Sequence, residues 1–216
     1  MMMNLFSTFD PCTGMMSMNW MSSIIIIMMF NFKFWMKSNN SMIMIQKMIN
    51  NLQKELNMIM PEKGSSLMFL SMSILILMNN LMGLVPYIFT SSSHLSFSLS
   101  MALPMWMSFM IYGWTKKTNM MFTHLVPNST PNMLMPFMVM IETISNLIRP
   151  GSLAVRLTSN MIAGHLLMTL LGNSCSIYLT WILIWMFMAL MLFETAVSLI
   201  QSYVFMILTT LYSSEI

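Results

Sequence analysis

The sequence predicts an all-α integral membrane protein with five transmembrane helices, and three observations lead to this prediction. First, charged residues make up only 7% of the chain and hydrophobic residues 57%, with a mean hydropathy of +0.73. Because a soluble domain carries about a quarter charged residues, this chain has too few charges to cover a water-facing surface. Second, several segments reach the roughly 20 apolar residues that a membrane span needs. Third, no segment alternates as a barrel strand would, and in lipid a helix satisfies its own backbone hydrogen bonds.

We expect a single membrane domain over residues 1–216, without a soluble domain. A continuous helix from 133 to 171 would be about 58 Å long, roughly twice the thickness of the hydrocarbon layer. The last two spans are therefore either broken, with Pro150-Gly151 as the obvious break, or tilted as a long hairpin. A tilted hairpin would leave a long face open to another membrane protein, and we expect this arrangement. The five expected spans cover roughly residues 18–36, 67–89, 95–115, 133–171 and 177–212.

The lysines orient these spans. They follow the first span, lie between the first and second, and follow the third, whereas the stretches SSSH at 91–94 and GNSCS at 172–176 contain none. Since basic residues accumulate on the inner side of a membrane, we expect the N-terminus outside and the C-terminus inside. The seven lysines are Lys33, Lys37, Lys47, Lys54, Lys63, Lys116 and Lys117.

The segment between the first two spans is expected to lie on the inner surface as an amphipathic helix over about residues 42–60. Polar residues, among them Lys47 and Lys54, occupy one side of this helix, and apolar residues occupy the other. The apolar positions are 45, 48, 49, 52, 56 and 59.

Composition also excludes several classes of protein. The net charge of +3 is too small for the dense basic surface that nucleic acid requires. Cys12 and Cys175 lie far apart and match no metal or disulfide pattern, so we expect neither a metal nor a cofactor. The first residues, MMMNLFSTFDPCTG, resemble neither a secretory signal nor a transit peptide.

The 35 methionines are spread evenly over positions that Leu or Ile could fill. Methionine is an adaptable apolar side chain, so this distribution favours a filling role over copper binding. A codon bias in an AT-rich mitochondrial genome would explain the number, and synthesis inside the organelle would explain the missing targeting signal.

Ionisable residues concentrate in the expected hairpin. An arginine at the centre of a membrane helix costs about 2.5–3.5 kcal/mol on insertion scales, and such residues usually mark a functional path. Arg156 lies near the middle of its span, where its side chain cannot easily reach the interface. The alternative is a buried Arg–Glu pair that only holds the hairpin together. The ionisable residues concerned are Glu142, Arg149, Arg156, His165 and Glu194.

Helical spacing distinguishes two faces around Arg156. Ser152, Arg156, Asn160 and Ala163 share one face, and small and polar residues beside a cation allow another helix to approach closely. His165 lies about half a turn away from Arg156, so we expect it to serve a separate role, directed toward the next helix.

Polar residues also form a stripe on the last span. Glu194, Ser198, Gln201 and Tyr212 fall on one helical face, which predicts either a water-filled half-channel or an ordinary polar seam between two helices. On the fourth span, Glu142 and Arg149 are seven residues apart on one face and are expected to pair.

Four stretches of the chain resemble a known family. The run ETISNLIRPGSLAVRLTSNMIAGHLL, followed by FETAVSLIQSYVFMILTTLYSSE, closely resembles subunit a of F-type ATP synthases in its animal mitochondrial form. Further similarities are NNLMGLVPYIFTSSSHL and the N-terminal NLFSTFDP, so the resemblance covers essentially the whole chain. The motif AVRL..NM.AGH is highly specific.

The resemblance implies a stator subunit beside a rotating ring of c subunits, with Arg156 as the essential arginine that faces the ring's carboxylates. Asn160 and Gln201 match positions near this arginine, and Tyr212 matches a tyrosine near the C-terminus. Other implied partners are the peripheral stalk subunits including b, small Fo subunits and the lipid of the mitochondrial inner membrane, but no nucleic acid. The chain would span that membrane several times, with its N-terminus toward the intermembrane space and its C-terminus toward the matrix, and would not be a catalyst by itself.

The resemblance also implies two proton paths. His165 and Glu194 would belong to the path that admits protons from the intermembrane space, and Glu142 to the path that releases them to the matrix. Bacterial relatives carry a glutamate at the position of His165 and a histidine at that of Glu194, so this chain has the mitochondrial arrangement. The family does not require a cation at Arg149, which is left outside the site.

Two other functions are compatible with a multi-span membrane protein. An autonomous ion transporter usually shows internal repeats with breaks in corresponding helices, and the sequence shows neither. A structural subunit of a respiratory complex needs no central arginine, and haem or quinone sites would require more histidines in spans than His165.

Overall fold

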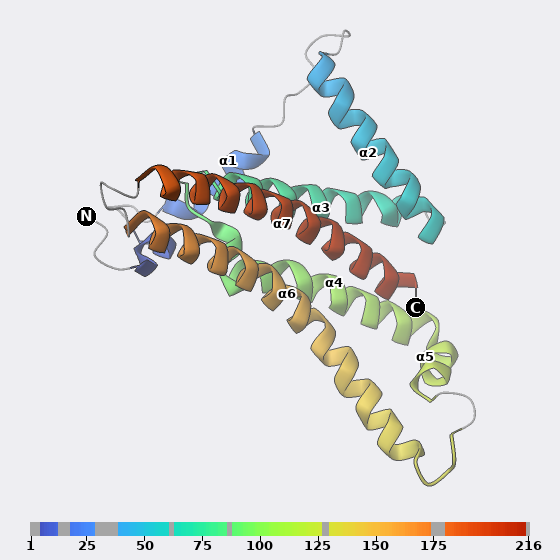
Figure 1. Ribbon diagram of the computed structural model, residues 1–216. Helices are drawn as coiled ribbons and strands as arrows, with labels where there is room; N and C mark the ends of the chain where they lie inside the picture. The colour runs from blue at the N-terminus through green and yellow to red at the C-terminus, as the bar shows by residue number, and fades with distance from the viewer. Residues whose placement is uncertain are drawn as a thin grey trace.

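The computed structural model describes residues 5–12, 18–28, 39–60, 63–85, 88–126, 130–173 and 180–214, and every regular element within them is helical (Figure 1). The α-helices are α1 Met21–Met28, α2 Asn40–Ile59, α3 Lys63–Gly83, α4 Leu95–Lys116, α5 Thr118–Leu125, α6 Met135–Asn173 and α7 Thr180–Ser214. Three short 3₁₀ helices are η1 Leu5–Phe9, η2 Met18–Trp20 and η3 Ser91–Ser93.

Among the described residues, three helices are long and apolar enough to cross a membrane: Gly64–Gly83, Leu95–Lys116 and Thr180–Ser214. They correspond to the second, third and fifth expected spans. The fourth coincides with α6, in which polar and charged residues lower the hydropathy. The first expected span, 18–36, is described only as far as residue 28.

The second span ends earlier than predicted. Its expected limits were 67–89, but α3 begins at Lys63 and ends at Gly83. The apolar run LVPYIF misled the prediction, because it continues beyond the helix. Pro86 follows closely in the sequence, and a proline soon after a helix end cannot continue the helix.

The long helices pack in pairs (Figure 1). α3 lies against α7, and α4 lies against α6, while α6 also contacts α7. α6 is continuous over 39 residues although it contains Pro150. It changes direction partway along its length in Figure 1, and its first part leaves the bundle. A proline inside a helix removes one backbone hydrogen bond and displaces the preceding turn, which accounts for a bend without a break.

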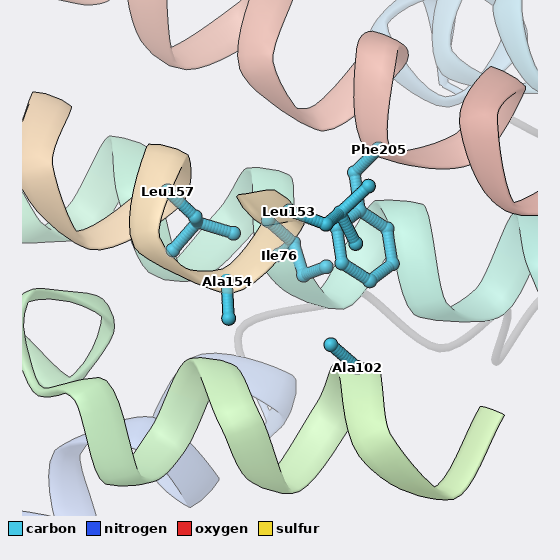
Figure 2. Close-up of a cluster of buried hydrophobic side chains, with 6 residues drawn as sticks. All are labelled: Ile76, Ala102, Leu153, Ala154, Leu157 and Phe205. Carbon is cyan, nitrogen blue, oxygen red and sulfur yellow. The ribbon is translucent and has the colours of Figure 1, made fainter. Parts of the chain in front are cut away.

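A compact apolar cluster joins the four long helices at the centre. Figure 2 shows Ala154 of α6 and Ala102 of α4 pointing into the space between these two helices. Such small side chains let membrane helices approach closely, where dispersion contacts hold them together. The cluster comprises Ile76, Ala102, Leu153, Ala154, Leu157 and Phe205.

The expected surface helix is present as α2, and only part of its apolar face contacts the protein. Leu56 is fully buried in a second apolar cluster with residues of α3, α4 and α7, and Ile49 and Leu52 are partly buried there. Met48 and Ile45, expected on the same face, are exposed. α2 is further fixed to α7 by the Tyr203 hydroxyl, which donates a hydrogen bond to Glu55 Oε2 (3.2 Å).

The start of α3, the end of α4 and the end of α7 lie at one end of the bundle, which we call the lysine end because Lys63, Lys116 and Lys117 occur there (Figure 1). Lys47 and Lys54 are exposed on α2, and Lys33 and Lys37 lie outside the described residues. The opposite end carries η3, the end of α6 and the beginning of α7, and we call it the η3 end.

The tight contact between α6 and α4 predicts the effect of enlarging Ala154, which is 0% exposed. Replacing it by leucine should destabilise the protein by about 1–3 kcal/mol, because extra methylene groups in a filled interface force the helices apart. Thermal unfolding of the purified protein in detergent would measure this as a lower midpoint. The neighbouring Val155→Leu variant, on the exposed face, is the control, and equal midpoints for both variants would contradict the prediction.

Candidate functional site

Arg156 lies on the face of α6 that the rest of the chain leaves open. Leu153, Ala154 and Leu157 of the same helix turn toward the core, whereas Val155 and Arg156 are exposed. Ser152 and Ala163 are exposed with it, as the shared helical face predicted. Within the described residues Arg156 makes no ion pair, so none of them holds it in an internal Arg–Glu lock.

Asn160 and Gln201 connect α6 to α7 one turn beyond Arg156. The Asn160 side-chain amide donates a hydrogen bond to Gln201 Oε1 at 3.2 Å. Gln201 is only 7% exposed, whereas Asn160 is partly exposed at the edge of the arginine face. This bond holds the two helices in register beside the arginine.

Glu194 is buried, with 6% of its surface exposed, and its carboxylate lies directly against Gly164 of α6. A Cβ atom at position 164 would collide with the carboxylate oxygens, so only glycine leaves room for this side chain. Ser198 and Gln201, predicted on the same stripe of α7, are also buried. These three members of the predicted stripe therefore face the interior, whereas Tyr212 is partly exposed.

His165 points away from Arg156, as its position on the helix predicted, but not toward α7. Its ring packs edge-on against Phe9 of η1, with ring centres 6.0 Å apart, and interacts with the backbone of Gly83 at the end of α3. The Nε2 atom is buried and has no hydrogen-bond partner among the described residues. The prediction that the histidine faces the next helix was wrong, because α3 and η1 cover that side of α6.

Glu142 and Arg149 form the expected pair, with 3.8 Å between Oε1 and the guanidinium. The same guanidinium lies over the ring of Tyr212, 5.0 Å from its centre. Arg149, which the resemblance left outside the site, thus connects two of the predicted site residues. They line a cavity of about 380 Å³ at the lysine end. The lining residues are Trp106, Phe109, Met110, Met121, His124, Leu125, Glu142, Asn146, Arg149 and Tyr212.

The cavity contains two polar residues that the sequence did not single out. Asn146 is four residues after Glu142, and this spacing could have revealed it. His124 lies in α5, and only the fold of α5 against α6 brings it to the cavity of Glu142. No group of three or more His, Cys, Asp or Glu side chains suited to a metal occurs in the described part of the chain.

The site residues thus form two groups on either side of Arg156. Glu142, with its cavity, is 14 residues before the arginine and His165 is nine residues after it, about 21 Å and 14 Å along a helix. One group opens at the lysine end, and the other lies toward the η3 end. A fixed positive charge on an open face lies between them.

Comparison with known proteins places these features in a family. The ATP synthase A chain family matches residues 2–214. ATP synthase subunit a of Locusta migratoria is 53% identical over 224 aligned residues, and that of Drosophila melanogaster is 53% identical over 223. The protein of the same name from Anopheles quadrimaculatus is 51% identical over 225 residues. Each alignment covers 100% of both chains. This chain therefore belongs to the ATP synthase A chain family.

Proposed function

We propose that this chain is the proton-translocating stator subunit of the Fo sector of a mitochondrial ATP synthase, and that it provides two proton half-channels at the surface of a rotating c-ring. The observation that carries the proposal is the uncovered Arg156 on the open face of α6. A guanidinium keeps its proton at physiological pH and is costly in lipid, so it needs an anionic partner outside this chain. The carboxylates of a c-ring would supply that partner.

The charge of Arg156 explains how a ring carboxylate could be turned over. A carboxylic acid that approaches a cation ionises more readily, since an opposite charge favours the charged form. The released proton would leave past Glu142 and its cavity. The carboxylate would then pass Arg156, take up a proton from the path at Glu194 and His165, and turn into lipid as a neutral group.

The separation of the two groups along α6 would keep the half-channels apart. A proton moving directly between them would have to pass a fixed positive charge, which repels it. Each elementary charge that crosses the membrane potential releases about 2.3 kcal/mol per 100 mV, so a direct leak would dissipate the energy that drives rotation.

The proposed arrangement has five spans, with α6 and α7 as a long tilted hairpin. The N-terminus would face the intermembrane space and the C-terminus the matrix, in agreement with the lysine end of the bundle. The exposed face of α6 would contact the c-ring, and peripheral stalk subunits including b and other small Fo subunits would bind elsewhere. Co-purification with a c-ring would separate this proposal from an autonomous transporter or a respiratory-complex subunit.

Replacing Arg156 by alanine tests the central claim. The variant should lose proton-driven ATP synthesis completely, because no charge would remain to draw the proton from a ring carboxylate. The measurement is ATP synthesis by the assembled complex in sealed vesicles under an imposed proton gradient. Val155→Ala, on the same exposed side, is the control and should retain activity. Robust synthesis by Arg156→Ala would refute the role.

Replacing Glu194 by glutamine should slow proton uptake by about 100-fold, the lower range for loss of one positioned acid–base group. Glutamine preserves the size of the side chain against Gly164, so assembly should be unaffected. The readout is passive proton conductance of Fo vesicles, with Ser198→Ala as a control on the same buried stripe. Conductance equal to that of the unmodified complex would remove Glu194 from the path.

Arg149→Met should separate the role of Arg149 from that of Arg156. The Glu142–Arg149 pair is partly exposed, so its loss should change the unfolding midpoint only slightly. Proton release should become slower, because Glu142 would lose the cation that holds it. Tyr212→Phe retains the ring beneath the guanidinium, so it should slow proton release less than Arg149→Met does. ATP synthesis rates measured for both variants would check this, and complete loss of synthesis in both would contradict it.

A further inference from the structure

The cavity beside Glu142 has an outer wall that takes no part in the mechanism described above. α5 forms this wall with Met121, His124 and Leu125, and it packs against both α4 and α6. The helix lies at the lysine end of the bundle (Figure 1). His124 lines the cavity and is also exposed, so its side chain lies between the cavity and the surface of the protein.

Glu142 needs a way out through this wall once the complex is assembled. Arg156 follows it by 14 residues, which is about 40° short of four full turns, so both side chains lie on nearly the same face of α6. In the proposed function a c-ring covers that face. A proton on Glu142 then has the cavity of about 380 Å³ on its other side, and this volume is ample for water.

Among the described titratable side chains that line the cavity, His124 is the one suited to carry a proton from Glu142 to the outer solution. A guanidinium and a phenol keep their protons at neutral pH, which excludes Arg149 and Tyr212. An imidazole both accepts and donates a proton between about pH 5 and 8. The cavity therefore holds one group that can alternate between its two protonation states under physiological conditions.

The charged residues around His124 do not trap a proton there. α5, with the sequence TNMMFTHL, contains no acidic residue, so no carboxylate of its own helix can bind an imidazolium. The charges that directly precede α5 are those of Lys116 and Lys117, which are positive and exposed. Glu142 is the acidic residue of the cavity lining, and its carboxylate already pairs with Arg149. A proton accepted by His124 can therefore pass on to water.

We infer that His124 is the last proton carrier of the release path, which takes the proton that leaves Glu142 and passes it to the solution at the lysine end. This inference rests on the function proposed above and adds α5 to the machinery. The neutral imidazole accepts the proton on a ring nitrogen through water, and Glu142 returns to its carboxylate. The imidazolium then gives up the proton to a base in the outer solution and becomes neutral again.

The alternative role of His124 is to stabilise α5. The residue lies in the last turn of this helix, where a cation interacts favourably with the carbonyl end. Such a role depends on the charge or the packing of the side chain, but not on the exchange of a proton with the solution. The two roles therefore differ in their response to an added proton carrier.

His124→Ala in the assembled complex should lower the passive proton conductance of Fo vesicles about tenfold in weakly buffered solution. This loss is smaller than the roughly 100-fold expected for an acid–base group without a bypass, because water alone still carries protons slowly. Free imidazole added on the lysine-end side should restore most of the conductance, since it can replace the missing side chain. A purely structural role for His124 predicts no such recovery.

Thr123→Ala is the matched control. Thr123 is exposed on the same helix, and its hydroxyl donates a hydrogen bond to the Met120 carbonyl within α5. The variant should conduct as the unmodified complex does, and its conductance in the same imidazole solution corrects for imidazole that crosses the lipid. His124→Gln keeps the approximate size of the side chain without its titration. It should lose conductance as His124→Ala does and recover in the same way.

Co-purification of the c-ring with each variant shows that assembly is intact, and if His124→Ala fails to assemble, His124→Gln carries the same test. Unchanged conductance in an assembled His124 variant, or a loss that imidazole does not restore, would overturn the inference. Neither result would affect the proposed function, whose failure would instead appear as ATP synthesis by the Arg156→Ala complex.

Discussion

A guanidinium keeps its proton at any physiological pH. Arg156 carries one on a stretch of α6 whose other exposed residues are apolar or small, namely Ser152, Val155, Ser159 and Ala163. None of the described residues forms an ion pair with Arg156. An unpaired charge of this kind is costly in lipid, so the open face of α6 is stable only against an acidic partner or water. The rest of the structure presents this charge outward and keeps Glu194, Ser198 and Gln201 inward.

Small residues let the helices pack closely enough to keep Glu194 inside the bundle. Gly164 gives the carboxylate of Glu194 a place between α6 and α7, and Ala154 and Ala102 bring α6 close to α4. Larger side chains at these positions would separate the helices and expose the buried stripe of α7. Membrane helices associate through such close contacts, because lipid supplies no hydrophobic force between them. The acidic group is therefore held by the space that Gly164 leaves for it.

The bent form of α6 separates the two ends of the site. Its first part diverges from the bundle (Figure 1). Together with α5 and the ends of α4 and α7, this part lines the cavity at Glu142. Its second part packs against α3, α4 and α7 and buries the groups near His165. Pro150 lies between the two parts, where the loss of one backbone hydrogen bond allows the change of direction. One helix thus serves two separate polar regions.

Composition and helical spacing alone predicted the all-α membrane class, the surface helix, the face that Arg156 shares with Ser152, the polar stripe that begins at Glu194 and the pairing of Glu142 with Arg149. Each of these depends on local periodicity or on the cost of charge in lipid, which the chain carries in its order of residues. Tertiary structure alone decided that Arg156 is exposed, that His165 contacts α3 and η1, and that His124 joins the Glu142 cavity. These positions depend on which helices become neighbours and on how far they are shifted along one another. Residues that become neighbours but lie far apart in the sequence leave no periodic signal.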